Sequence, residues 1–348
     1  MNNHADFQAL YAQHHLEMED FWSRRRSRLA HKVEFRLFGR LVRMTSNDFE
    51  VLSSADFSRP LYSAAPETNE VPFVIQIIVH ASPRASRNIP DDLVEKIHYT
   101  GNEHWLNIGF GEWGNCFVQM AEGRATAVLT PEFAKQPELV SRCMLDTIFT
   151  NLFTRNGFAM LHATALVRNE SILMLMAPHG GGKSTTALHL LLKGNAVLTD
   201  SMVFVTMRKN TLQLTGFPVG RIKLRQDMLP LFPQVRPFLS SEQVRGETKY
   251  TLDLKLFAPD QVCTQALSPA RLVLCLMKRH DQAESFFEEA RPESVWESVM
   301  HNSLHFDTLP IWQSNLELIA EVVQRAEWYH LFVGTDPQQL VRAVNAIW

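Results

Sequence analysis

One short segment constrains the fold more than any other: Ala-Pro-His-Gly-Gly-Gly-Lys-Ser-Thr at 177–185. It follows the apolar stretch 171–176, which predicts a buried strand, and it leads into 185–193, which predicts a helix ended by Gly194. A P-loop has this form, with four residues before Gly-Lys-Ser, and Ala177 stands where the first glycine usually lies. A strand, a glycine-rich turn and a helix in this order predict an α/β fold with a phosphate-binding turn.

The chemistry expected of this turn follows from its residue types. A helix N-terminus presents unpaired N–H groups and a partial positive charge, and consecutive glycines let the backbone curl around phosphate oxygens. Lys183 is expected to reach the β- and γ-phosphates, and the Ser184 hydroxyl is expected to hold Mg²⁺. The alternative is a glycine-rich turn with an incidental lysine. The residues expected to contact the nucleotide are Pro178, His179, Gly180, Gly181, Gly182, Lys183, Ser184 and Thr185.

Two further side chains are candidates for catalysis together with Lys183. Asp200 ends the predicted strand 196–200, and ligands bind at the carboxyl ends of strands in α/β sheets, so Asp200 is expected beside the γ-phosphate. There a carboxylate holds Mg²⁺ or accepts a proton from an attacking hydroxyl; otherwise it caps the strand. His162 lies on a strand of the preceding hairpin, 159–167 with 171–176, and on residue type alone it is more often a core histidine.

Cations downstream of the turn are candidates for contacting the substrate or the transferred phosphate. Arg-Ile-Lys-Leu-Arg at 221–225 alternates with period two, which predicts three cations on one face of a strand. Each cation taken alone is more often a surface charge. The candidates are Arg221, Lys223, Arg225, Lys249 and Arg271.

Length and composition set the broader frame. A chain of 348 residues suggests two domains, and the pattern changes near 155, which predicts domains over 1–155 and 156–348. A net charge of −3 gives no reason to expect nucleic acid or an anionic membrane as a partner. The four cysteines form no Cys-x-x-Cys pair and the N-terminus is polar, so we expect a cytoplasmic protein. The start of the chain, 1–31, predicts a helix with an arginine-rich, solvated end.

The motifs together resemble the HPr serine kinase/phosphorylase family, and more closely the bacterial HPr kinase-related proteins. The resemblance rests on Leu161-His162-Ala163, on the P-loop, and on Gly-Asn-Ala-Val-Leu-Thr-Asp at 194–200. Toward the C-terminus it weakens, and 1–150 carries no motif of the family. At one position the pattern differs, because Ser201 follows Asp200 where the family has a second aspartate.

The resemblance implies a P-loop domain with a mixed sheet akin to phosphoenolpyruvate carboxykinase. The strand and helix patterns of 1–155 predict a smaller α+β domain before it. It also implies Mg²⁺ and ATP, with transfer of the γ-phosphoryl group to a hydroxyl of a peptide serine or a small metabolite. Asp200 matches the base of the family, and His162 matches a residue that lines the phosphate site. Two alternatives stay open: a regulator or scaffold that binds nucleotide without transfer, and a nucleotide-hydrolysing switch. Because no Asn-Lys-x-Asp sequence is present, a GTP-dependent switch is disfavoured.

Overall fold

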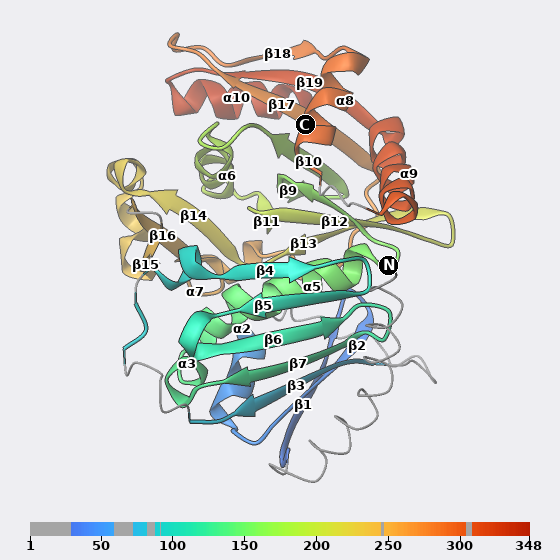
Figure 1. The fold of residues 1–348 in the computed structure, drawn as a ribbon. Coiled ribbons are helices and arrows are strands. Elements are labelled where there is room, and N and C mark those ends of the chain that lie inside the picture. Colours follow the sequence, from blue (N-terminus) through green and yellow to red (C-terminus); the bar gives the residue numbers. More distant parts are fainter. Residues whose placement is uncertain (1–28, 59–71, 82–87, 91, 245–246, 304–307) are drawn as a thin grey trace, which may run out of the picture.

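The structure is a computed structural model and describes residues 29–58, 72–81, 88–90, 92–244, 247–303 and 308–348. A helix is expected over 1–31, but residues 1–28 lie outside the described part of the chain. His31 belongs to the first strand. The described chain is a mixed α/β structure with four separate sheets. One sheet uses only residues before 130, and the other three use only residues after 158 (Figure 1).

The first sheet has seven strands in the order β1-β2-β3-β7-β6-β5-β4. Its strands β2, β3 and β7 are parallel neighbours, and its other pairs are antiparallel. The sequence predicts most of these strands, including the hairpin of β5 and β6 across the 3₁₀ turn η3 (Gly111–Trp113). Its bounds are β1 His31–Leu37, β2 Arg40–Ser46, β3 Phe73–Val79, β4 His98–Gly101, β5 Trp105–Gly109, β6 Gly114–Gln119 and β7 Arg124–Leu129.

A helical stretch joins this sheet to the rest of the chain. The sequence predicts a helix over 136–156, and the structure has α4, a π-type turn η4 and α5 there. The ring of Phe153 on α5 lies near Phe73 of β3 and Phe204 of β12 (Met202–Arg208), with ring centroids 5.4 and 6.3 Å apart. One hydrophobic cluster therefore spans both parts of the chain. The short helical elements here are η1 Glu50–Ser53, α2 Ser54–Ser58, η2 Leu93–Lys96, α3 Pro131–Ala134, α4 Pro137–Val140, η4 Ser141–Leu145 and α5 Asp146–Thr154.

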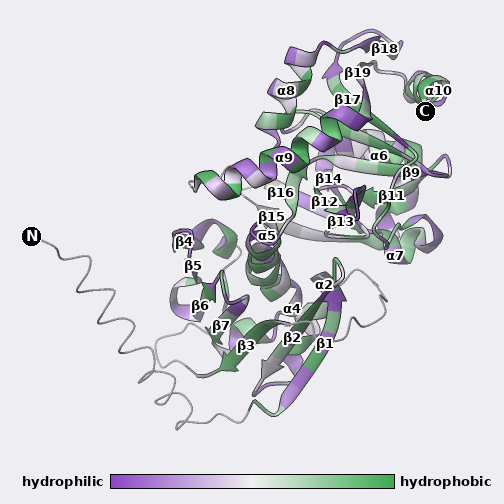
Figure 2. Ribbon diagram, turned by 90° about the vertical axis from the view of Figure 1, so that its right-hand side faces the viewer, coloured by the Kyte–Doolittle hydropathy of each residue, from purple (hydrophilic) through white to green (hydrophobic). Residues whose placement is uncertain are grey.

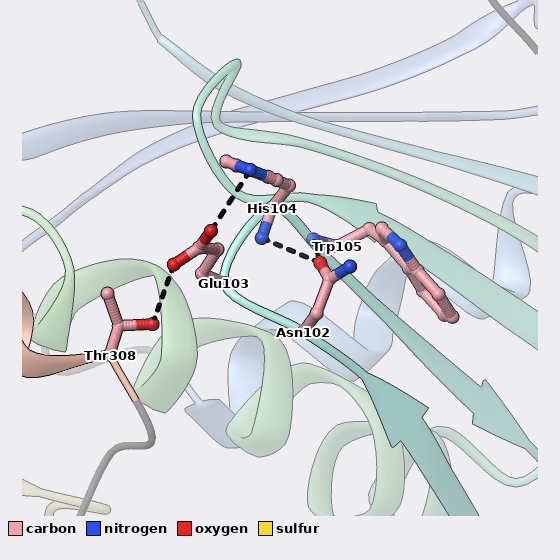
Figure 3. A network of polar contacts seen from close by, with 5 residues as sticks. All are labelled: Asn102, Glu103, His104, Trp105 and Thr308. Carbon is pink, nitrogen blue, oxygen red and sulfur yellow. Dashed lines mark hydrogen bonds and ion pairs between the residues drawn. The ribbon is translucent and has the colours of Figure 1, made fainter. Parts of the chain in front are cut away.

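Polar contacts also join the two parts of the chain. In the turn between β4 and β5, Glu103 accepts a 3.0 Å hydrogen bond from the hydroxyl of Thr308, which precedes α9 (Figure 3). The other Glu103 oxygen lies 3.3 Å from Nε2 of His104. Elsewhere, Arg208 at the end of β12 donates a 3.0 Å hydrogen bond to the carbonyl of Phe38, between β1 and β2. These contacts add to the aromatic cluster at the same junction.

The second part is built around a six-stranded sheet in the order β11-β9-β10-β17-β19-β18. β10, β17 and β19 are parallel neighbours, whereas β9, β11 and β18 are joined by antiparallel pairs, so this is the mixed sheet that the resemblance implies. The bounds are β9 Thr164–Arg168, β10 Ser171–Met176, β11 Ala196–Thr199, β17 Arg271–Arg279, β18 Phe286–Glu289 and β19 Ala326–Val333.

One expected strand is divided. The sequence predicts a single strand over 159–167, but the structure breaks it at the fully buried Ala163 into β8 (Ala159–His162) and β9. β8 pairs with β12 (Met202–Arg208) in a three-stranded sheet with β13 (Thr211–Phe217), whereas β9 pairs with β10 and β11. The apolar pattern is continuous through 159–167, so the sequence carries no mark of this change of sheet.

A second three-stranded sheet and four longer helices complete this part of the chain. The sheet has the order β14-β16-β15, with bounds Arg221–Arg225, Glu247–Asp253 and Leu239–Val244. Helices α8 and α9 show alternating hydrophilic and hydrophobic residues in Figure 2, which is typical of surface helices. The helical bounds are α6 Lys183–Leu191, η5 Gln226–Leu231, η6 Pro233–Phe238, α7 Leu254–Phe257, η7 Pro259–Gln261, α8 Pro292–His301, α9 Leu309–Arg325 and α10 Pro337–Ile347.

Candidate functional site

The glycine-rich turn has the geometry that its sequence predicts. β10 ends at Met176 and α6 begins at Lys183, two residues earlier than the sequence suggests. Gly180 and Gly182 have φ angles of 77° and 90°, a left-handed conformation that side chains oppose. A Cβ on Gly181 would lie 2.6 Å from that of Ala177. The three glycines therefore allow a tight turn onto the N-terminus of α6, where the first N–H groups have no partner within the helix.

Asp200 lies at the same edge of the sheet as this turn. β9 pairs antiparallel with both β10 and β11, so β10 and β11 run in the same direction and their carboxyl ends share one edge. Asp200 follows β11 directly. β9 lies between β10 and β11 in the sheet, and its first residue, Thr164, pairs with Leu175 of β10.

Three donors surround the Asp200 carboxylate. Oδ1 accepts a 2.7 Å hydrogen bond from the Thr164 hydroxyl, and Oδ2 accepts a 3.1 Å bond from the backbone N–H of Lys223. The Ser184 side chain lies near enough to act on the carboxylate. Burial nevertheless raises the pKa of Asp200 to about 6, although these three groups and the charge of Lys183 oppose the rise. A carboxylate with this pKa is ionised at neutral pH and is a stronger base than an ordinary aspartate.

Lys183 lies inside the turn. Its side chain is 8% exposed, and Nζ donates a 2.7 Å hydrogen bond to the carbonyl of Ala177. Burial lowers the pKa of Lys183, whereas the charge of Asp200 raises it. Lysine, serine and aspartate from the three expected positions are thus within electrostatic or hydrogen-bonding reach of one another.

The two histidines predicted at the site lie near Lys183. His162 is solvent-exposed, yet enough protein surrounds it that burial lowers its pKa, and the charges of Lys183 and His179 lower it further. A hydrogen bond to the backbone of Ser201 acts in the opposite direction. His162 is therefore not a core histidine, and its neutral form is favoured. Pro178, His179 and Gly180 are exposed at the tip of the turn, and Thr185 is half-buried in the first turn of α6.

The structure brings only some of the predicted cations to this edge. The backbone N–H of Lys223 donates a hydrogen bond to Asp200, and the charges of Lys249 and Arg221 act on the Lys223 side chain. Arg225 is two residues farther along the strand and forms an exposed ion pair of 3.2 Å with Asp227.

Arg271 is not brought to the site. It begins β17 opposite Ser171, at the amino end of β10 and so at the edge away from the turn. There it makes two hydrogen bonds of 2.7 and 2.6 Å to Glu327. The reason is orientation: β17 runs parallel to β10, so its first residue lies at the far edge of the sheet.

Sequence reasoning missed three residues near the site. Thr164 holds Asp200, and the charge of Arg142 on η4 acts on Lys223. Arg279 ends β17 at the near edge, and a Cβ on Gly182 would lie 3.7 Å from its Cδ. Two basic residues, Lys278 and Arg279, follow the apolar run 272–277, and they were the available signal, by the same strand-end argument that selected Asp200.

Comparisons with known proteins add little. No family model matches the chain, and no curated protein matches it. Among solved structures, the Hpr(Ser) kinase/phosphatase from Coxiella burnetii is similar at 11% sequence identity and a TM-score of 0.27, over 54% of this chain and 93% of that chain. This is a distant structural resemblance, and a TM-score this low carries no conclusion about function. The site is therefore interpreted from its own geometry.

Two further observations cover all the residues that the structure describes. No helix in the described ranges combines the length and apolar character that a membrane crossing requires. The described residues also contain no group of three or more His, Cys, Asp or Glu side chains suited to a metal ion.

Proposed function

We propose that the protein is an ATP-dependent kinase that transfers the γ-phosphoryl group to a hydroxyl, with Asp200 as the base. The observation that carries the proposal is the position of Asp200 at the carboxyl end of β11, on the same edge as the glycine-rich turn, with Lys183 close enough for its charge to act on the carboxylate. A turn that only binds a phosphate does not need a half-buried carboxylate beside it. A kinase does, because the acceptor hydroxyl must lose a proton.

The proposed step involves three partners. The acceptor oxygen bonds to the γ-phosphorus while its proton passes to the Asp200 carboxylate. The bond from the γ-phosphorus to the bridging oxygen of ATP breaks, and ADP leaves. Lys183 and the N–H groups at the start of α6 stabilise the negative charge of the phosphates, and Arg279 adds a cation at Gly182. His162, held neutral beside Lys183, lines the phosphate site without adding charge.

The donor set also fits the Mg²⁺ that accompanies ATP. Mg²⁺ prefers oxygen ligands and is usually held by one or two carboxylates together with phosphates and water. Ser184 and Asp200 supply a hydroxyl and a carboxylate that lie near each other, so these two residues would hold it. When bound, Mg²⁺ neutralises phosphate charge during transfer.

The division of labour along the chain belongs to the same proposal. Residues 156–348 carry Lys183, Ser184, Asp200 and His162, and residues 1–155 contribute to recognising the acceptor. Arg142 supports this second role, because its charge acts on Lys223 beside Asp200.

Calorimetric titration with Mg²⁺–ATP tests the nucleotide site. Lys183→Ala should abolish measurable binding, because it removes the charge that compensates the phosphates. Lys193→Ala is the matched control, since Lys193 is exposed just beyond the other end of α6 and its loss should leave the affinity unchanged. Equal affinity in both variants would remove the P-loop assignment.

Transfer is tested separately from binding. The protein is incubated with γ-labelled ATP and candidate acceptors, and stable phosphoester products are measured for the wild type and for Asp200→Asn. Label in products that depends on Asp200 supports a kinase. Normal ATP binding with no transfer to any acceptor would instead favour a nucleotide-binding regulator.

A further inference from the structure

Two phenylalanine rings stack at the carboxyl edge of the six-stranded sheet. Phe286 begins β18 and is the cross-strand partner of Phe332, the last residue but one of β19. Their ring centroids lie 4.8 Å apart, with 14° between the ring planes. Phe332 is half-buried and has Lys278 Nζ 5.5 Å from its ring centre, whereas Phe286 is 40% exposed. Phe286 and Phe332, here called the aromatic platform, therefore present a flat apolar surface to solvent.

Neighbouring groups hold the aromatic platform in place. The imidazole of His280 lies near both rings, with its centroid 5.7 Å from that of Phe286 and 6.5 Å from that of Phe332. Nδ1 of His280 accepts a 3.3 Å hydrogen bond from the backbone N–H of Gln282. The backbone N–H of His280 donates a 3.1 Å hydrogen bond to the carbonyl of Val333, which ends β19. A surface fixed in this way loses little conformational entropy when a ligand binds to it.

The aromatic platform lies at the same edge of the sheet as the glycine-rich turn. β10, β17 and β19 are parallel neighbours, so their carboxyl ends share one edge. At this edge Arg279 ends β17, and its Cδ lies 3.7 Å from the position of a Cβ on Gly182. The next residue, His280, lies near both rings of the platform. Two consecutive residues thus connect the turn to the platform.

The order of the strands places the aromatic platform on the side of the turn away from Asp200. In the order β11-β9-β10-β17-β19-β18, the turn follows β10 and Asp200 follows β11, two strands to one side. The platform lies on β19 and β18, two and three strands to the other side. With neighbouring strands about 4.8 Å apart, it is roughly 10–15 Å from the end of β10. A nucleotide whose γ-phosphate faces Asp200 therefore extends its ribose and base toward the platform.

We propose that the aromatic platform binds the purine base of the nucleotide by stacking. The proposal rests on the kinase function proposed above, and it adds the residues that recognise the nucleoside. Every nucleobase has a flat π face, and stacking on an aromatic side chain needs no hydrogen bond to the base. The alternative is that the two rings only stabilise the edge strand β18 as a cross-strand pair. The two alternatives differ in whether the affinity for the nucleotide depends on Phe286.

The test compares two ligands that share three linked phosphates and differ in the nucleoside. Mg²⁺–ATP and Mg²⁺–tripolyphosphate are each titrated calorimetrically into the full chain. Both ligands occupy the turn, so Lys183→Ala should abolish the binding of both. Only ATP carries a base, so Phe286→Ala should weaken ATP binding by about tenfold, the scale of a lost stack between a base and an aromatic ring. The same variant should bind tripolyphosphate within about twofold of the wild type, because the platform does not contact the phosphates.

Three further variants separate stacking from other effects of the substitution. Phe286→Tyr keeps an aromatic ring and should retain the ATP affinity within about twofold. Phe332→Leu keeps apolar bulk without a flat ring, and it should weaken the binding of ATP but not of tripolyphosphate. Phe49→Ala is the matched control, because it removes a ring that is 72% exposed in the first part of the chain and should leave both affinities unchanged. Thermal unfolding shows whether each variant folds.

The outcomes separate the two proposals. If the wild type binds both ligands but Phe286→Ala binds ATP as the wild type does, or loses both ligands equally, the role of the aromatic platform is overturned while the nucleotide site stands. If the wild type binds tripolyphosphate but not ATP, the platform does not receive a base. If the wild type binds neither ligand, the nucleotide site fails, and the proposal for the platform fails with it.

Discussion

Thr164 and Asp200 come from neighbouring antiparallel strands, and the Thr164 hydroxyl donates a 2.7 Å hydrogen bond to Oδ1 of Asp200. Thr164 is fully buried, so this bond is protected from competition with water. It stabilises the ionised carboxylate against the burial that raises its pKa. The threonine therefore lowers the pKa of the aspartate, although burial has the larger effect.

The first prediction concerns pH. A base works only when it is deprotonated, so kcat/KM should fall about tenfold per pH unit as the pH drops below the Asp200 pKa of about 6. Thr164→Val removes a bond that lowers this pKa, so the acid limb of the profile should move to higher pH. Thr206→Val, which removes a threonine hydroxyl bonded to the Gly157 carbonyl, is the control and should leave the limb in place. An unmoved limb in Thr164→Val would mean that another group is the base.

The second prediction separates base from metal ligand. Asp200→Asn keeps the shape of the side chain but removes its basicity. Transfer should fall by about 10²-fold or more, while ATP affinity changes only a few-fold. The measurements are γ-phosphate transfer and nucleotide binding on the same preparation. Near-normal transfer would make Asp200 a structural cap, and loss of Mg²⁺–ATP binding would make it chiefly a metal ligand.

The third prediction compares the two ends of one strand. Arg279 ends β17 beside Gly182, whereas Arg271 begins β17 at the opposite edge. Arg279→Gln should lower kcat by about 10²-fold, the scale for removing one donor to developing charge. Arg271→Gln breaks only an exposed pair with Glu327 and should leave kcat unchanged. Equal kcat values in the two variants would show that Arg279 does not act on the phosphate.

The fourth prediction concerns the junction between the two parts of the chain. Phe153→Ala should lower the free energy of unfolding by about 3–5 kcal/mol, because the ring is fully buried and contacts aromatic rings from both parts. Chemical denaturation measures this difference. A loss well below 1 kcal/mol would show that the two parts do not depend on this helix for their packing.

Local patterns made the glycine-rich turn between a strand and a helix, and the position of Asp200 at a strand end, predictable from the sequence. A glycine-rich turn between a strand and a helix, followed by a strand ending in a carboxylate, defines one edge of a sheet without knowledge of the remaining strands. Thr164 could not be found in this way, because the change of sheet at Ala163 occurs inside a continuous apolar run.

The cations were harder to place because their positions depend on pairings between distant segments. Arg271 was expected near the substrate, but the parallel pairing of β17 with β10 puts it at the far edge, and Arg279 lies beside the glycine-rich turn. Arg142 depends on the packing of η4 near β14, for which no residue pattern gives a signal. The alternation of 221–225 did identify its outward face correctly, because that pattern is local to one strand.

The break at Ala163 also restricts how this chain can change in length. His162 and Thr164 lie on either side of one residue, on strands that belong to different sheets. Inserting or deleting a residue there would rotate one of the two side chains to the opposite face of its strand, away from Lys183 or Asp200. The turn at 169–170 positions no residue of the candidate site. Homologous chains should therefore vary in length at this turn and keep the spacing from His162 to Thr164.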